Sequence, residues 1–358
     1  MLIAAHGSAR VAINGFGRIG RAFFKLALEK PELEVVAIND LGDIEFLAYL
    51  LKYDSAYGKY DKEVSTKETE GRKYLVVDGQ EVLFLQEKEP TALPWGSMNV
   101  DIVLESTGVF ESFEKAKVHI QAGAKRVVLS APAKDDDGSV NSPQGGPDGR
   151  TVLMGINTDE FKTCTLSSNG SCTTNSISPV MQILTEKLGV KKAYLNTTHS
   201  YTATQTLIDG PVGKSTDYRR GRAAAMNIAP SSTGAAVALG RVITPLTGKF
   251  DGMALRVPTI TGSISAITFV SERPTTVEEI NDLFKQAEKE ERWKGILRTT
   301  TEQLVSTDII GDPHAAIVDL SLTKVVDGDL CAVYSWYDNE FGYTNTLIRH
   351  VVEVARSL

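Results

Sequence analysis

A cysteine at the start of a predicted helix is the residue whose type and position most directly suggest chemistry. Cys172 follows a polar turn, residues 168–171, and precedes an apolar run spaced as the buried face of a helix. In the first turn of a helix, a thiol faces unpaired backbone N–H groups and the positive end of the helix dipole, which favour the thiolate. We therefore expect Cys172 to act as a nucleophile. The alternative is a buried structural cysteine, because free cysteines are usually buried and apolar surroundings raise the thiol pKa.

A glycine-rich turn near the N-terminus predicts a dinucleotide site. Residues 15–20, with the sequence GFGRIG, follow a predicted strand and open a predicted helix. Such glycines allow a tight turn and a close approach of the backbone to a pyrophosphate, which binds at the helix N-terminus. Asp40 ends the next predicted strand, about 20 residues further on, where a carboxylate would bind a ribose diol and repel a 2′-phosphate. The pattern predicts NAD rather than NADP, against the alternative of a turn chosen for packing alone.

Size and composition limit the class of protein. The chain has 358 residues, which suits about two domains at roughly 150 residues each. Hydrophobic and charged contents of 42% and 23% are those of a globular protein, and the net charge of −7 gives no general basic surface for nucleic acid. No apolar run reaches the about 20 residues that span a bilayer, and residues 1–10 lack a secretory signal pattern. We expect a cytoplasmic protein, and three cysteines without a histidine cluster predict no metal site.

The first half of the chain must position the glycine turn. Short apolar runs alternate there with amphipathic segments, which predicts an α/β fold with a largely parallel, doubly wound sheet. The predicted strands are residues 11–13, 34–38, 82–85, 102–104 and 127–129, and the predicted helices are 18–29, 44–52 and 112–122. The polar residues 135–150 interrupt this pattern as a surface loop, to which the sequence assigns no role.

The second half of the chain changes in pattern and must position Cys172. Longer β-type runs at 253–257, 264–271, 317–326 and 330–336, with helices around 233–242 and 277–291, predict an α+β domain on a mainly antiparallel sheet. We therefore expect an NAD-binding Rossmann domain at residues 1–170 and a catalytic domain at 171–343. A final amphipathic helix, residues 344–358, is expected to pack back near the first domain.

Motifs in a fixed order make the chain resemble the phosphorylating, NAD-dependent glyceraldehyde-3-phosphate dehydrogenase family over nearly its whole length. They are NGFGRIGR at 14–21, ESTGVF at 105–110, SCTTN at 171–175, HSYTATQ at 199–205, STGAA at 232–236, RVPT at 256–259 and SWYDNEFGY at 335–343. The resemblance implies oxidation of D-glyceraldehyde 3-phosphate to 1,3-bisphosphoglycerate with NAD and inorganic phosphate, a step of glycolysis. It also implies a homotetramer, in which the loop at 201–225 packs between subunits near the cofactor.

The resemblance also assigns roles to residues. It implies that Cys172 is the nucleophile and His199 its acid–base partner, with no metal. The residues implied to hold the substrate phosphate and the attacking phosphate are Ser171, Thr173, Thr202, Arg219, Thr233, Gly234 and Arg256. The residues implied to bind NAD are Gly15, Gly17, Arg18, Ile19, Asp40, Lys88, Ser130, Asn339 and Tyr343. Among these, Asn339 is implied to contact the nicotinamide carboxamide and Tyr343 to pack beside the nicotinamide ring.

The chain departs from the family pattern at three places. Ser176 stands where the family often has a second cysteine, which removes a possible redox partner of Cys172. The 135–150 loop is longer than the pattern. The segment 212–222 is about two residues longer as well, so that Arg220 or Arg222 could take the role assigned to Arg219. These arginines could also be a solvated basic run.

A thiol and an imidazole suit aldehyde oxidation, because an aldehyde carries no electron pair that could expel a hydride. Addition of Cys172 would give a hemithioacetal, which can lose hydride once His199 takes its hydroxyl proton. Without the family motifs, His199 would be taken for a satisfied buried side chain. Two other functions remain open: an erythrose-4-phosphate dehydrogenase with the same chemistry, and a non-enzymatic binding protein on the same scaffold. The negative net charge and the intact Cys–His pair argue against the second.

Overall fold

The computed structural model describes residues 8–138, 140–141, 147–212 and 217–358. Parts of the first ten residues, of the 135–150 loop and of the 212–222 segment, including inserted residues near Lys214, lie outside this description. The chain divides into two compact units. The first comprises Met1–Val152, Asn157–Gly170 and Leu347–Leu358, and the second comprises Leu153–Ile156 and Ser171–Thr346.

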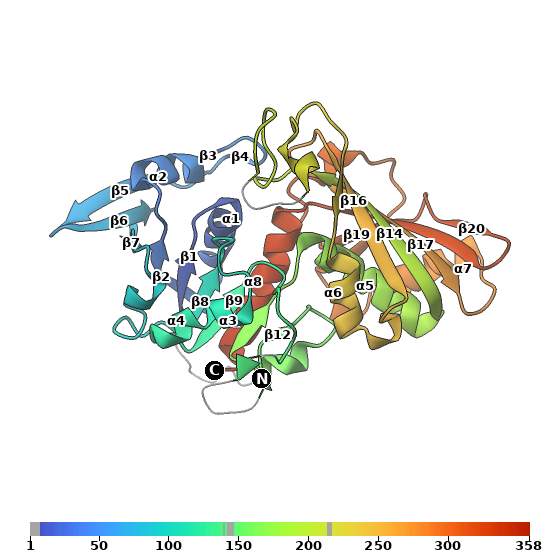
Figure 1. Ribbon diagram of the computed structural model, residues 1–358, viewed down its shortest axis with the longest axis horizontal. Helices are drawn as coiled ribbons and strands as arrows, with labels where there is room; N and C mark the ends of the chain where they lie inside the picture. The colour runs from blue at the N-terminus through green and yellow to red at the C-terminus, as the bar shows by residue number, and fades with distance from the viewer. Residues whose placement is uncertain (1–7, 139, 142–146, 213–216) are drawn as a thin grey trace. The chain divides into compact units, whose positions relative to one another are not determined.

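A nine-stranded sheet organises the first unit, with β1, β8 and β9 side by side at its centre (Figure 1). The strand order is β12-β13-β9-β8-β1-β2-β7-β6-β5, and the strands from β12 to β7 run parallel. Their bounds are β1 Ala9–Asn14, β2 Leu33–Asn39, β7 Gln80–Leu85, β8 Ile102–Glu105, β9 Arg126–Leu129, β12 Arg150–Thr151 and β13 Leu166–Ser168. The predicted doubly wound α/β sheet is therefore confirmed.

An antiparallel extension of this sheet was missed from the sequence. Strands β5 (Val64–Thr69) and β6 (Arg72–Val77) pair with each other, and β6 pairs antiparallel with β7. Most side chains of β5 are exposed, so the strand lacks the apolar alternation that identifies a half-buried strand. Smaller elements of the unit are β3 Tyr53–Asp54, β4 Gly58–Lys59, β10 Val140–Asn141, β11 Pro147–Asp148 and the 3-10 turns η1 Pro90–Ala92 and η2 Thr158–Lys162.

Helices α1 (Arg18–Ala27) and α2 (Ile44–Lys52) follow β1 and β2. The region predicted as a helix at 112–122 is helical, but it is divided into two short helices, α3 Phe113–Ala116 and α4 Val118–Gln121. Lys117 separates them with a ψ of −20°, a value typical of 3-10 geometry. A buried cluster that includes Trp95 and Phe113 packs against residues of the parallel strands.

The 135–150 loop is only partly a surface loop. Asp148 is completely buried, and its carboxylate accepts hydrogen bonds from the backbone N–H of Thr165, at 2.6 Å, and from the Thr165 hydroxyl. Asp135 accepts from the N–H groups of Phe113 and Glu114 at the start of α3. Carboxylates of the loop therefore bind the Rossmann-type sheet and its helices, a role that the composition did not reveal.

An eight-stranded sheet organises the second unit. The order is β15-β16-β14-β17-β21-β19-β18, with β20 paired to β21. The pairs β14–β16 and β18–β19 are parallel and the other pairs antiparallel, which confirms the mainly antiparallel prediction. The bounds are β14 Val190–Ser200, β15 Ala229–Ser232, β16 Phe250–Val257, β17 Ser263–Ser271, β18 Leu297–Thr300, β19 Ala316–Asp319, β20 Lys324–Val326 and β21 Leu330–Tyr337.

Two predicted elements of this unit differ from the structure. The β-type run at 317–326 is two strands, β19 and β20, because Asp319 accepts hydrogen bonds from the backbone N–H and the hydroxyl of Ser321 and so forms a turn. The helix predicted at 277–291 ends earlier, as α7 Val277–Ala287. The other helices are α5 Cys172–Lys187, α6 Ala235–Val242 and α8 Phe341–Arg356, with 3-10 turns η3 Tyr218–Gly221, η4 Thr244–Leu246, η5 Glu291–Trp293 and η6 Ser306–Ile309.

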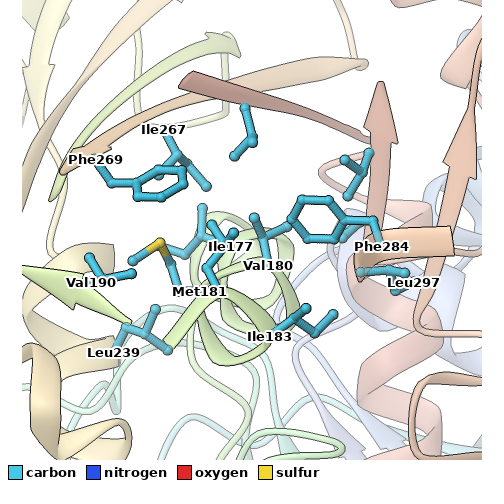
Figure 2. Close-up of a cluster of buried hydrophobic side chains, with 14 of the residues drawn as sticks. Ile177, Val180, Met181, Ile183, Val190, Leu239, Ile267, Phe269, Phe284 and Leu297 are labelled. Carbon is cyan, nitrogen blue, oxygen red and sulfur yellow. The ribbon is translucent and has the colours of Figure 1, made fainter. Parts of the chain in front are cut away.

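Helix α5 is the centre of the second core. Figure 2 shows Ile177, Val180 and Met181 on this helix, with Ile267 and Phe269 of β17 beside them. Pro179 lies inside α5 and has no N–H to donate to the carbonyl of Asn175, one turn earlier. The hydroxyl of Ser178 donates to that carbonyl instead, at 3.2 Å. The helix that begins at Cys172 is thus anchored in the core along most of its length.

Among the described residues, no helix combines the length and the apolar character that crossing a membrane requires.

Candidate active site

Cys172 is the first residue of α5, as predicted from the turn before it. Ser171 caps the helix, since its Oγ accepts a hydrogen bond from the N–H of Thr174 at 3.0 Å. Gly170 has a positive φ of 66°, a backbone conformation that favours glycine, and it lets the chain turn into the helix. This geometry places the thiol at the end of a helix whose backbone N–H groups point outward.

His199 reaches Cys172 from β14. Alternate residues of this strand, Leu195, Thr197 and His199, are buried, which places their side chains on the same face of the sheet. The Nε2 atom of His199 lies 3.3 Å from the Sγ of Cys172. The structure therefore brings together a nucleophile and a possible base that are far apart in the chain, a juxtaposition that the sequence implied only through the family resemblance.

Arg256 completes this group from the neighbouring parallel strand. In the β14–β16 register His199 is opposite Arg256. The Nη1 atom of Arg256 lies 2.7 Å from the Nδ1 atom of His199 and donates to the carbonyl of Ser200 at 3.0 Å. The same carbonyl lies 2.7 Å from Nδ1. Burial and the nearby Arg256 guanidinium lower the pKa of His199 to about 3, so that the imidazole is neutral at physiological pH.

The electrostatics of Cys172 differ from the expectation. Burial raises the pKa of its thiol, although the Arg256 charge and hydrogen bonds from Thr173 act in the opposite direction. The helix N-terminus was expected to favour the thiolate, but the loss of hydration outweighs it. Burial thus favours the neutral thiol, and proton transfer to His199 would give the nucleophilic thiolate.

Tyr337 was missed as a site residue, although it lies in one of the recognised motifs. Its phenol is buried, and its oxygen lies 3.0 Å from the hydroxyl of Thr173 and 2.8 Å from that of Thr197. Its ring meets the imidazole of His199 edge-on at 5.9 Å. The alternation of buried residues along β21 is the signal that could have placed this side chain on the inner face.

Of the three arginines Arg219, Arg220 and Arg222, it is Arg220 that faces His199. Its guanidinium donates to the hydroxyl of Ser231 from two nitrogens, at 2.8 and 3.0 Å, and its charge contributes to the lowered pKa of His199. Arg219 is exposed and forms a bidentate pair with Asp217. Arg222 pairs with Asp209 at 2.8 Å. The role assigned to Arg219 thus fits Arg220 better.

The other predicted anion-binding residues lie at strand and helix ends. Thr202 follows β14, and its hydroxyl is 2.9 Å from that of Thr204. Thr233 precedes α6, and Gly234 caps that helix with space around the position that a Cβ would occupy. Hydroxyls and backbone N–H groups of this kind bind oxyanions.

The glycine turn of the first unit has the geometry that a pyrophosphate site requires. Gly15 has a φ of 97°, and a Cβ at Gly20 would lie 2.1 Å from the carbonyl oxygen of Gly15. At Gly17, the residue that precedes α1, a Cβ would meet nothing within 4 Å. The turn is therefore closed on the side of the sheet and open at the helix N-terminus, where Ile19 also lies. Gly15, Gly17 and Gly20 therefore fit the pyrophosphate of NAD.

Asp40 is held beside this turn. One carboxylate oxygen accepts the N–H of Phe16 at 2.6 Å, and the other accepts the N–H of Gly42 at 2.8 Å. Arg18, in the first turn of α1, forms an ion pair with Asp54 at 3.2 Å. The predicted ribose-binding carboxylate and the predicted pyrophosphate turn are thus neighbours within the first unit.

Behind the turn lies a buried hydrogen-bond network that the sequence did not suggest. The hydroxyl of Ser106 donates to the carbonyl of Gly15 at 2.7 Å. Glu105 accepts from the side-chain amide of Asn14 at 2.6 Å and from the N–H of Thr107 at 2.8 Å. Ser130 follows β9, and its N–H donates to the backbone carbonyl of Glu105 at 2.9 Å. Lys88, another predicted NAD-binding residue, is exposed. The network holds the ends of three parallel strands together.

Asn339 and Tyr343 belong to the second unit. The Oδ1 atom of Asn339 accepts from the hydroxyl of Ser263 at 2.9 Å, which directs the amide nitrogen, a donor, away from that hydroxyl. Asp338 accepts from the N–H groups of Glu340 and Phe341 at the start of α8. Tyr343 is buried in the first turns of that helix.

The two other cysteines are less exposed than Cys172. Both are buried, and all three are free. Burial, with help from the Asp148 charge, raises the pKa of Cys164 to about 12, and burial also raises the pKa of Cys331. In the part of the chain that the structure describes, no three His, Cys, Asp or Glu residues form a group that could hold a metal ion.

Comparison with known proteins identifies the family. A family model described as the glyceraldehyde 3-phosphate dehydrogenase NAD binding domain matches residues 9–113, and the model of the C-terminal domain matches residues 171–339. Similar relatives named glyceraldehyde-3-phosphate dehydrogenase occur in Mycobacterium avium, at 46% identity over 98% of this chain and 100% of the relative, and in Clostridium pasteurianum, at 45% over 95% and 96%. A relative from Streptomyces coelicolor is 44% identical over 98% and 99%. The chain therefore belongs to the glyceraldehyde-3-phosphate dehydrogenase family, and it is an NAD-dependent oxidoreductase.

Proposed function

We propose that the chain converts D-glyceraldehyde 3-phosphate, NAD and inorganic phosphate into 1,3-bisphosphoglycerate and NADH, as a step of glycolysis. The observation that supports this most directly is the group formed by Cys172, His199 and Arg256, in which a thiol lies 3.3 Å from a neutral imidazole beside a guanidinium. The names of the relatives point to the same three-carbon substrate. The glycolytic direction and a cytoplasmic location stay predictions.

The first step is the addition of Cys172 to the aldehyde. The sulfur forms a bond to the carbonyl carbon, the thiol proton passes to the Nε2 atom of His199, and the carbonyl oxygen becomes an alkoxide. The lowered pKa of His199 leaves the imidazole neutral, and the neutral form is the one that can accept this proton. Protonation of the alkoxide by His199 gives a hemithioacetal on Cys172 and returns the histidine to its neutral form.

The second step is oxidation of the hemithioacetal carbon. NAD supplies the acceptor for the hydride when it is bound. His199 takes the hydroxyl proton, so that the oxygen electron pair forms the carbonyl of a thioester as the hydride leaves. The thioester keeps the acyl group activated for transfer and attached to Cys172.

The third step is attack of inorganic phosphate on the thioester. A phosphate oxygen bonds to the acyl carbon, the carbon–sulfur bond breaks, and the Cys172 thiolate recovers a proton from His199. Arg256 and Arg220 supply positive charge for the substrate phosphate and the attacking phosphate, together with the hydroxyls of Thr173, Thr202 and Thr233. The two arginines lie close enough that each lowers the pKa of His199, which supports a site for anions.

One assay tests this function and the alternative substrate. NADH formation is followed spectrophotometrically with glyceraldehyde 3-phosphate or erythrose 4-phosphate, each with and without inorganic phosphate. We expect the three-carbon aldehyde to have the higher kcat/KM and turnover to depend on phosphate. Preferred oxidation of erythrose 4-phosphate would favour the sister activity. Absence of NADH formation with both aldehydes would favour a binding role.

We also propose that the chain assembles as a homotetramer. The segment between β14 and β15 exposes large apolar side chains: Leu207, Ile208, Tyr218, Met226 and Ile228 are each at least 68% exposed. Apolar groups concentrated in one segment are typical of an interaction surface. Light scattering in native buffer should give four times the 38.8 kDa chain mass. A mass near one chain, with full activity, would refute the assembly.

A further inference from the structure

A buried carboxylate, Glu105, is the centre of the hydrogen-bond network behind the glycine turn. Its side chain is 3% exposed and lies at the end of β8, opposite the last residue of β1. One oxygen, Oε2, lies 2.6 Å from the Nδ2 atom of Asn14 and 3.0 Å from the Nε2 atom of His119. The other oxygen, Oε1, accepts the N–H of Thr107 at 2.8 Å and the hydroxyl of the same residue. Four donors therefore fill the acceptor positions of one carboxylate.

The hydrogen-bond partners of His119 determine where its proton lies. The indole nitrogen of Trp95 can only donate, and it lies 3.2 Å from the Nδ1 atom of His119. Nδ1 therefore keeps its electron pair, and the proton of the neutral ring is on Nε2, from which it is donated to Glu105. The His119 ring is completely buried, and the ring of Phe110 meets it edge-on at 5.8 Å. Each polar side-chain atom in the series Trp95, His119 and Glu105 thus has a partner of the matching kind.

A second arm of the network leads from Glu105 toward the carboxylate that is predicted to bind the ribose. The Oδ1 atom of Asn14 accepts from the Nδ2 atom of Asn39 at 2.8 Å, which turns the amide nitrogen of Asn14 toward Glu105. Asn39 is 5% exposed and precedes Asp40, and its Oδ1 atom accepts the N–H of Glu87 at 2.8 Å. The buried series Glu105, Asn14 and Asn39 therefore follows the carboxyl ends of β8, β1 and β2.

The segments that follow these three strands form the edge at which a doubly wound sheet binds a dinucleotide. The glycine turn follows β1, the ribose carboxylate follows β2, and a loop, residues 106–110, follows β8. The loop lies directly against the turn, because a Cβ at Gly15 would be 2.6 Å from the backbone nitrogen of Thr107. Residues 107–109 are exposed. The network therefore holds, from the buried side, segments whose outer side is open to a ligand.

We propose that Glu105 is a positioning residue for NAD, and that His119 and Trp95 hold its carboxylate in place for this role. The role depends on NAD binding by the first unit and not on the identity of the aldehyde. Glu105 acts through the backbone of the turn and of the loop, which it fixes before the cofactor arrives, so that less of the chain must be ordered on binding. Loss of the carboxylate should therefore weaken NAD binding and leave the chemistry at Cys172, in the second unit, largely unchanged.

Calorimetric titration of the full chain with NAD tests this role without an aldehyde. In Glu105→Gln the amide keeps one acceptor oxygen and brings an NH₂ group against the donors that face either Oε1 or Oε2, so the loop or the turn must move. We expect the dissociation constant for NAD to rise about tenfold, or about 1.4 kcal/mol, while kcat at saturating NAD stays within about threefold of wild type. Glu114→Gln, which changes an exposed carboxylate in α3, is the matched control and should bind NAD like the wild type. An unchanged dissociation constant in folded Glu105→Gln would overturn the proposal.

A second variant tests the contribution of His119. His119→Phe keeps a buried ring but removes the donor to Glu105 and the acceptor for Trp95, and it should raise the dissociation constant about fivefold. The double variant Glu105→Gln/His119→Phe should bind NAD about as weakly as Glu105→Gln alone, because both changes break the same series. Melting temperatures establish that each variant is folded during the titration. If the two effects multiply instead, His119 does not act through Glu105, and that part of the proposal is wrong.

Hydrogen exchange of the wild type tests the same idea without any substitution. The N–H of Thr107 donates to Glu105, and the N–H of Val109 donates to the Thr107 hydroxyl at 3.0 Å. Although this loop is exposed, both amides should exchange slowly in protein freed of NAD, and adding NAD should change their protection by less than about threefold. Fast exchange that becomes slow only with NAD would show that the cofactor, and not Glu105, orders the loop.

Discussion

His199 and Arg256 are opposite each other in the register of the parallel strands β14 and β16, at the carboxyl ends of both. Helix α5 presents Cys172 to the same point, 3.3 Å from the imidazole. The three side chains come from three elements that pack around one core. Their geometry is therefore a property of the folded unit and of no single motif.

Replacement of the nucleophile should separate chemistry from cofactor binding. Cys172→Ser is expected to lower kcat for aldehyde oxidation by at least about a thousandfold, because a hydroxyl ionises far less readily than a thiol. NAD binding, measured by fluorescence titration, should remain close to that of wild type, since the glycine turn and Asp40 belong to the other unit. Turnover within tenfold of wild type would exclude a thioester mechanism.

The three cysteines should differ in reactivity. Burial raises the pKa of all three thiols, to about 12 for Cys164, but Cys172 is partly exposed and lies 3.3 Å from His199, whereas Cys164 and Cys331 are buried. Limited alkylation followed by peptide mapping should find the label on Cys172 first. In His199→Asn the labelling of Cys172 should slow while that of the other two is unchanged. Labelling of Cys164 ahead of Cys172 would show that the site is assigned wrongly.

Asp40 should determine the preference for NAD. The wild type is expected to prefer NAD over NADP by at least about tenfold in kcat/KM, or roughly 1.4 kcal/mol, because the carboxylate repels a 2′-phosphate. Asp40→Ala should narrow this ratio by weakening NAD and by relieving the repulsion of NADP. Asp61→Ala, an exposed carboxylate after β4, is the matched control and should keep the wild-type ratio. Equal efficiency of the wild type with both cofactors would place the ribose elsewhere.

Arg220 and Arg219 offer a comparison between adjacent arginines. Arg220 faces Ser231 and His199, whereas Arg219 is exposed and paired with Asp217. Arg220→Leu should raise the KM for inorganic phosphate or for the aldehyde about tenfold, as expected for the loss of a charge-assisted hydrogen bond. Arg219→Leu should change either KM by less than about threefold. A larger effect at Arg219 would restore the assignment implied by the family resemblance.

His350 should make stability depend on pH. It is completely buried in α8, its Nε2 lies 2.7 Å from the hydroxyl of Ser167, and burial lowers its pKa to about 3. Between pH 6.5 and 3 the unfolded chain binds a proton that the folded chain does not, so stability is lost as the pH falls below about 6.5. The loss at pH 5 is about 2 kcal/mol.

The melting temperature of His350→Gln should therefore fall less between pH 7 and pH 5 than that of the wild type. Differential scanning calorimetry at both pH values measures the two differences. Equal differences in the variant and the wild type would show that His350 takes up a proton in the folded chain.

The sequence predicted those parts of the fold in which local pattern and burial agree. The start of α5 at Cys172 followed from a capping residue and an apolar helical face, and the turn at Gly15 followed from its glycines. The run at 317–326 was misread, because a single carboxylate, Asp319, turns the chain between two strands. Pattern methods read average hydrophobicity, which one side-chain hydrogen bond does not change.

The site was harder to predict than the fold. Tyr337 lies in a recognised motif, yet its hydrogen bonds to Thr173 and Thr197 depend on three elements that meet only after folding. The choice between Arg219 and Arg220 depends on which of two neighbours points inward, and no periodicity identifies this in an irregular segment. The contact between His199 and Arg256 depends on a distance of 2.7 Å between Nδ1 and Nη1, which only coordinates can supply.

The alternation of buried and less buried side chains along β14 limits where residues can be inserted or deleted in this chain. Leu195, Thr197 and His199 share the buried face because they are two residues apart. Deletion or insertion of one residue between Val190 and His199 would turn the imidazole to the opposite face or bury a lysine in place of a core side chain. Compared with β14, length around the catalytic pair can therefore vary more readily after Ser200, in the segment where Thr202 and Arg220 lie. New substrate preferences can arise there by insertion while the catalytic pair is inherited unchanged.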